Sequence, residues 1–301
     1  MAATKFAGVI VPMITPFRRD FSLDLEATRW LARKLAGEGI TGLFPCSTAG
    51  EFVHLSRGEK EELIRAVVEE AGGKTRVLPG ICANCTLECI ELGRMAADLG
   101  ADGVVVTPPF YFRLKRDHLY KHFSEIAERV DLPIIVYNIP SLTGNPIPID
   151  LYVQLAEEYG NVVGCKITLD STSYIRRLIE EVKSSRRDFS VLTGLDDHLL
   201  NTLVLGGDGG IVGCANFAAK LHVELYEAFR EGDCTRAHEA HRRISALMAI
   251  YDVASSFPTA IKSALKLLGA PIEPVPRPPL TPEPPEVEEA IRKILERVGL
   301  L

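Results

Sequence analysis

The sequence lacks the features that mark nucleic-acid-binding, membrane and secreted proteins. It has no basic tract and a formal charge of −6, so we expect neither nucleic acid nor an anionic membrane as its main partner. No apolar run is long enough to span a bilayer. Its first residues, MAATKFAGVIVPMITPF, do not pair a charged segment with an apolar one as a signal peptide does. We therefore expect a cytoplasmic protein.

Metal and nucleotide motifs are also missing. Three of the seven cysteines lie in CANCTLEC, residues 82–89, but no second Cys or His pair follows at a zinc-site spacing. We interpret this stretch as small buried residues before a helix that Thr86 caps. No G-x-G-x-x-G follows the first strand, and LGGDGG at 205–210 precedes a strand instead of opening a helix. The sequence predicts neither a metal nor a cofactor.

What the chain does have is regular alternation of two patterns. Helical stretches with apolar residues at i, i+3, i+4 and i+7 alternate with short, almost continuously apolar runs, which are typical of parallel strands covered on both faces. The predicted strands span 7–14, 42–46, 76–81, 103–107, 133–137, 162–167, 190–194 and 209–213. Eight such units predict an α/β fold, a (β/α)8 TIM barrel, with an open doubly wound sheet as the alternative.

More helices follow the eighth unit. Their patterns lie near 217–231, 234–252 and 258–268, and EVEEAIRKILERVG forms a last one. The proline-rich stretch 271–286 suits neither helix nor strand. We expect it to hold this last helix against the barrel. We therefore assign residues 1–216 to the barrel core and residues 217–301 to a helical extension packed on it, in the same structural unit.

Polar side chains collect at the predicted carboxyl ends of the strands, where a barrel of this kind has its active site. These candidates are Thr48, Tyr111, Tyr137, Lys166, Thr168, Asp196 and Asp197. Lys166 lies inside an apolar strand, NVVGCKITLD, although an unpaired buried ammonium is costly. An apolar setting favours the neutral amine, which attacks carbonyl groups. The alternative is a lysine that is paired with a buried carboxylate or that reaches solvent from the strand end.

Two further groups are placed to assist Lys166. Tyr137 ends the preceding strand, and neighbouring parallel strands are about 4.8 Å apart, so its phenol can meet the amine and relay protons. The alternative is an aromatic whose hydroxyl only caps the core. STAGE, residues 47–51, offers two hydroxyls and a turn with free backbone N–H groups at Thr48 and Ala49, which suits a carboxylate.

With these residues in place, the sequence resembles the superfamily of N-acetylneuraminate lyase and dihydrodipicolinate synthase along essentially its whole length. STAGE is similar to the family's G-[ST]-[ST]-G-E turn, and YNIPSLTG to its Y-N-x-P-x-x-[ST]-G segment. GCKITLD resembles its lysine strand, and LGGDGGIVGCAN its G-x-x-G-x-I…N element. The order of these motifs at successive strand ends carries the resemblance.

The resemblance implies a role for each residue. Lys166 forms a Schiff base with pyruvate, Tyr137 shuttles protons with Thr48, and Tyr111 completes the relay from a neighbouring subunit. The carboxylate is held by the turn, through the amides of Thr48 and Ala49. The other implied substrate-binding residues are Ser47, Thr168, Asp196, Asp197 and the carbonyl of Ile211. The family also implies a homotetramer built from tight dimers.

Departures from the family pattern reduce the range of substrates that we expect. The synthases carry an arginine where this chain has Leu142, and that arginine binds the carboxylate of the second substrate. Leu142 cannot make this contact. Ser47 replaces a glycine and Ala49 a polar residue of the turn. Gly213 replaces a serine of the sialic acid lyases. PPFYF and YNIPSLTG look most like the 2-keto-3-deoxy-sugar-acid aldolases.

We therefore predict a pyruvate-dependent class I aldolase, a carbon–carbon lyase that joins or cleaves pyruvate and an aldehyde. Its substrate would be a 2-keto-3-deoxy acid. Three alternatives share the iminium chemistry: dihydrodipicolinate synthase, 4-hydroxy-2-oxoglutarate aldolase and a dehydratase. A fourth is a barrel that binds a 2-keto acid without turnover, although a binder needs no proton relay such as Lys166, Tyr137 and Thr48 provide.

Overall fold

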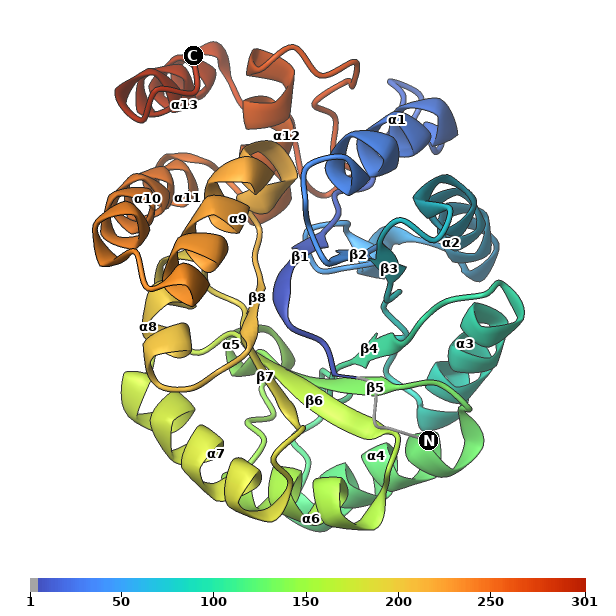
Figure 1. Cartoon of the computed structure of the whole chain (residues 1–301). Helices are drawn as coiled ribbons and strands as arrows, with labels where there is room; N and C mark the ends of the chain where they lie inside the picture. Colours follow the sequence, from blue (N-terminus) through green and yellow to red (C-terminus); the bar gives the residue numbers. More distant parts are fainter. Residues whose placement is uncertain (1–4) are drawn as a thin grey trace. The chain divides into compact units, whose positions relative to one another are not determined.

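The computed structural model describes residues 5–301, which form two compact units. Unit 1 consists of residues 5–8 and Val77–Ile211, and unit 2 of Val9–Arg76 and Val212–Leu301. Strands alternate with helices along unit 1 and the first stretch of unit 2, and the second stretch of unit 2, Val212–Leu301, contains helices only (Figure 1). The predicted division at residue 216 between a barrel core and its extension stays a prediction.

Unit 1 contains five parallel strands in the order β8-β7-β6-β5-β4. Their bounds are β4 (Val104–Val106), β5 (Ile134–Asn138), β6 (Val162–Ile167), β7 (Ser190–Thr193) and β8 (Gly209–Ile211). Every residue of these strands is buried, as their apolar runs predict. Because the strands are parallel, their carboxyl ends meet at one edge of the sheet, and Tyr137 lies opposite Lys166 there.

Helices connect the strands of unit 1 along the chain. They are α3 (Thr86–Asp98), α4 (Arg116–Arg129), α5 (Pro140–Thr143), α6 (Ile149–Glu158), α7 (Thr172–Ser185), the 3-10 turn η2 (Asp196–His198) and α8 (Leu199–Val204). Helices α6 and α7 lie side by side (Figure 1), and Leu155 and Leu178 join the same hydrophobic core. Helix α7 begins where the Ser171 hydroxyl accepts a hydrogen bond from the Tyr174 amide.

Unit 2 combines three strands with the helices of both chain ends. The strands are ordered β3-β2-β1, with bounds β1 (Gly8–Pro12), β2 (Gly42–Phe44) and β3 (Arg76–Val77), of which only Gly8 and Val77 fall in unit 1. The first helices are α1 (Leu25–Ala36), η1 (Phe52–His54) and α2 (Arg57–Ala71). The later ones are α9 (Ala215–Glu231), α10 (Cys234–Leu247), α11 (Ala249–Val253), α12 (Phe257–Leu267) and α13 (Pro285–Arg297). A capping box between Ser56 and Glu59 starts α2.

The structure confirms the eight predicted strands and the C-terminal helices. This order of elements is in line with a (β/α)8 barrel. The stretch before α13 is neither helix nor strand, and α13 packs on α10, α11 and α12. Within residues 5–301 no single helix has the length and apolar run to cross a bilayer. Only the pair Cys234–Val253 and Phe257–Leu267, bent by 117°, passes that test together.

The predicted cap of α3 is wrong. Cys85 occupies the N-cap position, and Thr86 is the first helical residue. The Thr86 hydroxyl instead lies 3.0 Å from Nδ1 of His122. Burial lowers the pKa of His122 to about 4, so its neutral ring needs polar partners, and Thr86 supplies one of them. This long-range demand overrides the local capping preference.

Candidate active site

The buried lysine and tyrosine come together at the carboxyl ends of β5 and β6. Tyr137 and Lys166 are only 2% and 3% exposed. They are direct neighbours in the strand register, and Nζ of Lys166 lies 4.1 Å from the centre of the Tyr137 ring. Rigid strands hold both side chains, which suits a site that needs an amine and a phenol at fixed positions. The predicted proximity of these two residues is therefore confirmed.

Thr168 joins this pair from the segment after β6. Its hydroxyl donates to the Tyr137 oxygen at 3.3 Å, and its amide donates to the carbonyl of Asn138 at 2.9 Å. The hydroxyl thereby places a second polar group beside the phenol. Lys166, Tyr137 and Thr168 form one continuous cluster of an amine, a phenol and an alcohol.

Gly194, which the sequence analysis did not select, makes room for that cluster. A Cβ at position 194 would lie 1.9 Å from the Thr168 hydroxyl oxygen and 2.8 Å from Cε of Lys166. Any side chain there would displace the lysine or the threonine. A glycine at the end of a strand next to the lysine strand is the signal that could have indicated this close approach.

The two predicted aspartates follow β7 in the short turn η2. Asp196 is 2% exposed, whereas Asp197 is half-buried. Oδ1 of Asp197 is buried and has no hydrogen-bond partner among residues 5–301. Because β7 pairs with β6, this turn follows the strand next to that of Lys166. Ile211, the last residue of β8, is fully buried.

Tyr111 lies apart from this cluster, on the loop between β4 and α4. Its side chain is 87% exposed, and its backbone has φ of +92°, which is unusual for a bulky residue. The base of the loop is fixed, since Nδ2 of Asn145 donates to the carbonyls of Pro109 and Phe112 at 2.8 Å each. A strained, exposed aromatic on an anchored loop is a candidate for contact with another molecule.

In unit 2, the turn after β2 contains three more of the predicted site residues. Ser47 and Ala49 are buried and Thr48 is half-buried. The Ser47 hydroxyl donates to the Met13 carbonyl and accepts from the Gly50 amide, each at 3.0 Å. The amides of Thr48 and Ala49 donate to no acceptor within residues 5–301. Two adjacent unpaired N–H groups in a rigid turn suit an anion such as a carboxylate.

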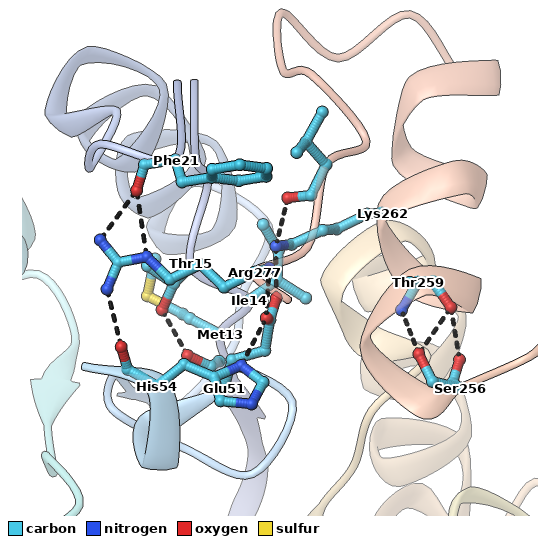
Figure 2. Close-up of polar contacts among 12 residues, drawn as sticks. Met13, Ile14, Thr15, Phe21, Glu51, His54, Ser256, Thr259, Lys262 and Arg277 are labelled. Atoms are coloured by element: carbon cyan, nitrogen blue, oxygen red, sulfur yellow. Dashed lines mark hydrogen bonds and ion pairs between the residues drawn. The ribbon is translucent and has the colours of Figure 1, made fainter. Parts of the chain in front are cut away.

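Gly50 is required for the shape of this turn. A Cβ there would lie 2.7 Å from the Met13 carbonyl oxygen and 3.1 Å from the Thr15 hydroxyl. The Thr15 hydroxyl donates to the Gly50 carbonyl at 2.7 Å (Figure 2). The next residue, Glu51, is buried and ion-paired with Lys262, a partner that the sequence analysis did not identify.

Comparison with known proteins identifies the family. A profile of the Dihydrodipicolinate synthetase family matches residues 5–298. The chain belongs to this family. It is 54% identical over 298 residues to an uncharacterised DapA-like lyase of Thermofilum pendens, covering 99% of both chains. It is 38% identical over 297 residues to a probable 2-dehydro-3-deoxy-D-pentonate aldolase, YjhH, of Escherichia coli K12, again covering 99% of both.

A solved structure shows the same relationship. The crystal structure of YagE, a prophage protein of the dihydrodipicolinic acid synthase family from E. coli K12, was determined in complex with pyruvate. It matches this chain with a TM-score of 0.96 at 35% identity, over 98% of this chain and 99% of that one. These findings confirm the predicted family and the predicted class of enzyme, a carbon–carbon lyase of the aldolase type.

Proposed function

We propose that this family member is a Schiff-base-forming, pyruvate-dependent aldolase that cleaves a 2-keto-3-deoxy acid to pyruvate and an aldehyde, or joins them. The observation that carries the proposal is the buried Lys166 amine over the ring of Tyr137, with the Thr168 hydroxyl on the same phenol. Relatives such as YjhH, named a probable 2-dehydro-3-deoxy-D-pentonate aldolase, support the substrate class.

In the proposed cycle the amine of Lys166 attacks C2 of the substrate, Tyr137 gives its proton to the hydroxyl group formed there, and water leaves to give an iminium and a phenolate. As the C3–C4 bond breaks, its electrons move onto the iminium to form an enamine. Tyr137 accepts the proton of the C4 hydroxyl, so the C4 fragment leaves as an aldehyde. The enamine is then protonated at C3, and water hydrolyses the resulting iminium to release pyruvate and the free amine.

The remaining residues take roles from the family resemblance. The amides of Thr48 and Ala49 bind the substrate carboxylate, Ser47 shapes their turn, and the Thr48 hydroxyl joins the proton relay. Thr168 and the two aspartates of η2 bind hydroxyl groups of the aldehyde portion, and the Ile211 carbonyl lines the pocket. We also propose that the eight strands close into a (β/α)8 barrel. The iminium is the electron sink, so the cycle invokes no metal or cofactor.

Reductive trapping tests the proposal. The protein is incubated with pyruvate and sodium borohydride, and its intact mass is measured beside that of Lys166→Ala. We expect a reduced pyruvate adduct in the wild type and none in the variant. If neither protein forms an adduct, the aldolase proposal is wrong, and a barrel that binds a 2-keto acid without turnover takes its place.

One observation favours a second candidate, dihydrodipicolinate synthase. Leu142 occupies the place of the synthase arginine, but the guanidinium of Arg113 donates to the carbonyl of Gly144, two residues away. Arg113 therefore brings a cation to the segment that in the synthases binds a second carboxylate. Condensation of pyruvate with aspartate semialdehyde, lost in Arg113→Ala, would favour the synthase. Cleavage of 2-keto-3-deoxy acids without that condensation would exclude it.

We extend the proposal to a cytoplasmic homotetramer of tight dimers in which Tyr111 reaches the partner's site. The exposure of Tyr111 and Phe112, 87% and 74%, supports a contact at this loop. A Tyr111→Ala variant should dissociate more readily and turn over more slowly, as measured by light scattering and by the rate of pyruvate release. A wild-type monomer with full activity would rule out this role.

A further inference from the structure

The turn 47–50 ends at a residue in a strained conformation. Glu51 has φ of +54°, in the left-handed region that costs free energy for a residue other than glycine. Its amide donates to the Thr48 carbonyl at 3.1 Å, so this conformation closes the turn around the amides of Thr48 and Ala49. A strained residue persists only where surrounding contacts hold it. The contacts of the Glu51 side chain therefore decide how firmly the turn is fixed.

One of those contacts is local, since Nδ1 of His54 lies 3.1 Å from Oε2 of Glu51, and the others come from the far end of the sequence (Figure 2). Nζ of Lys262, in α12, lies 2.5 Å from Oε1 of Glu51 and 2.9 Å from the carbonyl of Val275. The amide of Arg277 donates to Oε2 of Glu51 at 2.9 Å. Glu51 and Lys262 are 2% and 0% exposed, so this ion pair is cut off from water. Both carboxylate oxygens of Glu51 are thus held by the C-terminal segment.

The Arg277 side chain forms a second anchor. Its guanidinium donates to the carbonyls of Phe21 and His54, at 2.8 Å and 2.7 Å, and is paired with Glu59 at the start of α2. The ring of Phe17 lies beneath both cations, 4.4 Å from Nζ of Lys262 and 4.5 Å from Cζ of Arg277. Lys262 and Arg277 therefore hold the segment before the turn, residues 17–21, and the segment after it, residues 54–59.

We propose that Lys262 and Arg277 are positioning residues for the substrate carboxylate: through Glu51 they hold the amides of Thr48 and Ala49 where these bind it. This inference rests on the proposed aldolase function. The helical extension then belongs to the substrate-binding machinery, although it supplies no group that reacts. Without the ion pair the turn retains its sequence but loses the contacts that fix its closing residue.

A comparison of two carbonyl compounds distinguishes a loss of carboxylate binding from general damage to the structure. Pyruvate has a carboxylate for the turn to bind, whereas acetaldehyde forms an imine with Lys166 but has no carboxylate. In Lys262→Met we expect the pyruvate concentration for half-maximal borohydride trapping to rise at least about tenfold. Trapping of acetaldehyde at Lys166, followed by peptide mass, should stay unchanged. Lys266→Met is the matched control, since Lys266 is an exposed lysine one turn further along α12.

A second variant keeps the test decisive if Lys262→Met does not fold. Glu51→Gln with Lys262→Met removes both buried charges, so it restores folding without restoring the ion pair. It should show the same selective loss of pyruvate trapping. Equal pyruvate dependence in the Lys262 variants, Lys266→Met and the wild type would overturn the inference and leave the aldolase proposal intact. Absence of any pyruvate adduct in the wild type would instead overturn the proposed function and this inference with it.

Discussion

Lys166 in unit 1 and Lys262 in unit 2 are both almost fully buried, and both lie over an aromatic ring. Their polar surroundings differ. Lys262 has the Glu51 carboxylate at 2.5 Å, whereas Nζ of Lys166 lies over the ring of Tyr137, whose hydroxyl accepts a hydrogen bond from Thr168. A carboxylate partner stabilises the charged ammonium, which is not a nucleophile. A phenol and an alcohol are groups that pass protons.

The comparison separates two uses of a buried lysine. Burial lowers the pKa of Lys262 to about 8, and the charge of Glu51 works against that shift. The lysine is thus held in an ion pair that ties distant parts of the chain together. The neighbours of Lys166 are instead those of a reacting group. The partner of the amine, rather than its burial, distinguishes the structural lysine from the catalytic one.

Removing each lysine should have very different effects on turnover. Lys166→Met loses the nucleophile, so we expect kcat/KM for cleavage of a 2-keto-3-deoxy acid to fall by about ten-thousandfold or more. Lys262→Met keeps the nucleophile and should lose far less, with most of the loss in KM. Steady-state assays of pyruvate release measure both. A Lys166→Met enzyme within tenfold of the wild type would contradict the assignment.

The order of the two effects should reverse for stability. Lys262→Met leaves the Glu51 carboxylate buried without its cation, which costs about 3–5 kcal/mol of the free energy of unfolding. Lys166→Met removes an amine that lies over the Tyr137 ring and should cost less, about 1 kcal/mol, the usual size for a single substitution. Urea unfolding of the two variants provides the comparison. Equal losses would show that the two sites do not differ in this way.

Tyr137→Phe tests the phenol beside Lys166 without removing its ring. The variant keeps the aromatic face but loses the proton relay, so kcat should fall by about a hundredfold to a thousandfold. Pyruvate should still be trapped by borohydride, because imine formation needs the amine first. Full turnover in this variant would mean that Tyr137 only packs against the lysine.

The free energy of unfolding should depend on alkaline pH through the protonation of Lys262. Its folded-state pKa of about 8 lies below the ordinary lysine value of 10.5, so the unfolded chain binds more protons between these two values. The contribution of Lys262 to the free energy of unfolding is therefore flat below pH 8 and rises from pH 8 to 10.5, by at most about 3 kcal/mol. Lys262→Met should lack this rise when both proteins are unfolded by urea across that range. Parallel pH profiles would show that Lys262 keeps its ordinary affinity for protons.

The pattern of the sequence was enough to predict the alternating elements and the meeting of Tyr137 with Lys166. Both follow from local periodicity and from the rule that parallel strands align their carboxyl ends. The Glu51–Lys262 pair was not predictable in this way, because 211 residues separate its members. A lysine in a strand covered on both faces is conspicuous, whereas a lysine in a helix normally has an exposed face available.

Two other features escaped prediction because they depend on packing between distant segments. Gly194 is needed only because Thr168 and Lys166 fill the space where its Cβ would be. Thr86 was assigned as a helix cap, but its hydroxyl pairs with the buried ring of His122 on another helix. Local preferences describe each segment alone, and neither requirement exists until the segments pack together.

The position of a pyruvate adduct distinguishes the chemistry of the two buried lysines. Wild-type protein is treated with pyruvate and borohydride, digested, and the modified lysine is identified by peptide mass spectrometry. We expect a pyruvate adduct on Lys166 and an unmodified Lys262 in the same sample. An adduct on Lys262, or on surface lysines alone, would contradict the claim that the partner of a buried amine decides its chemistry.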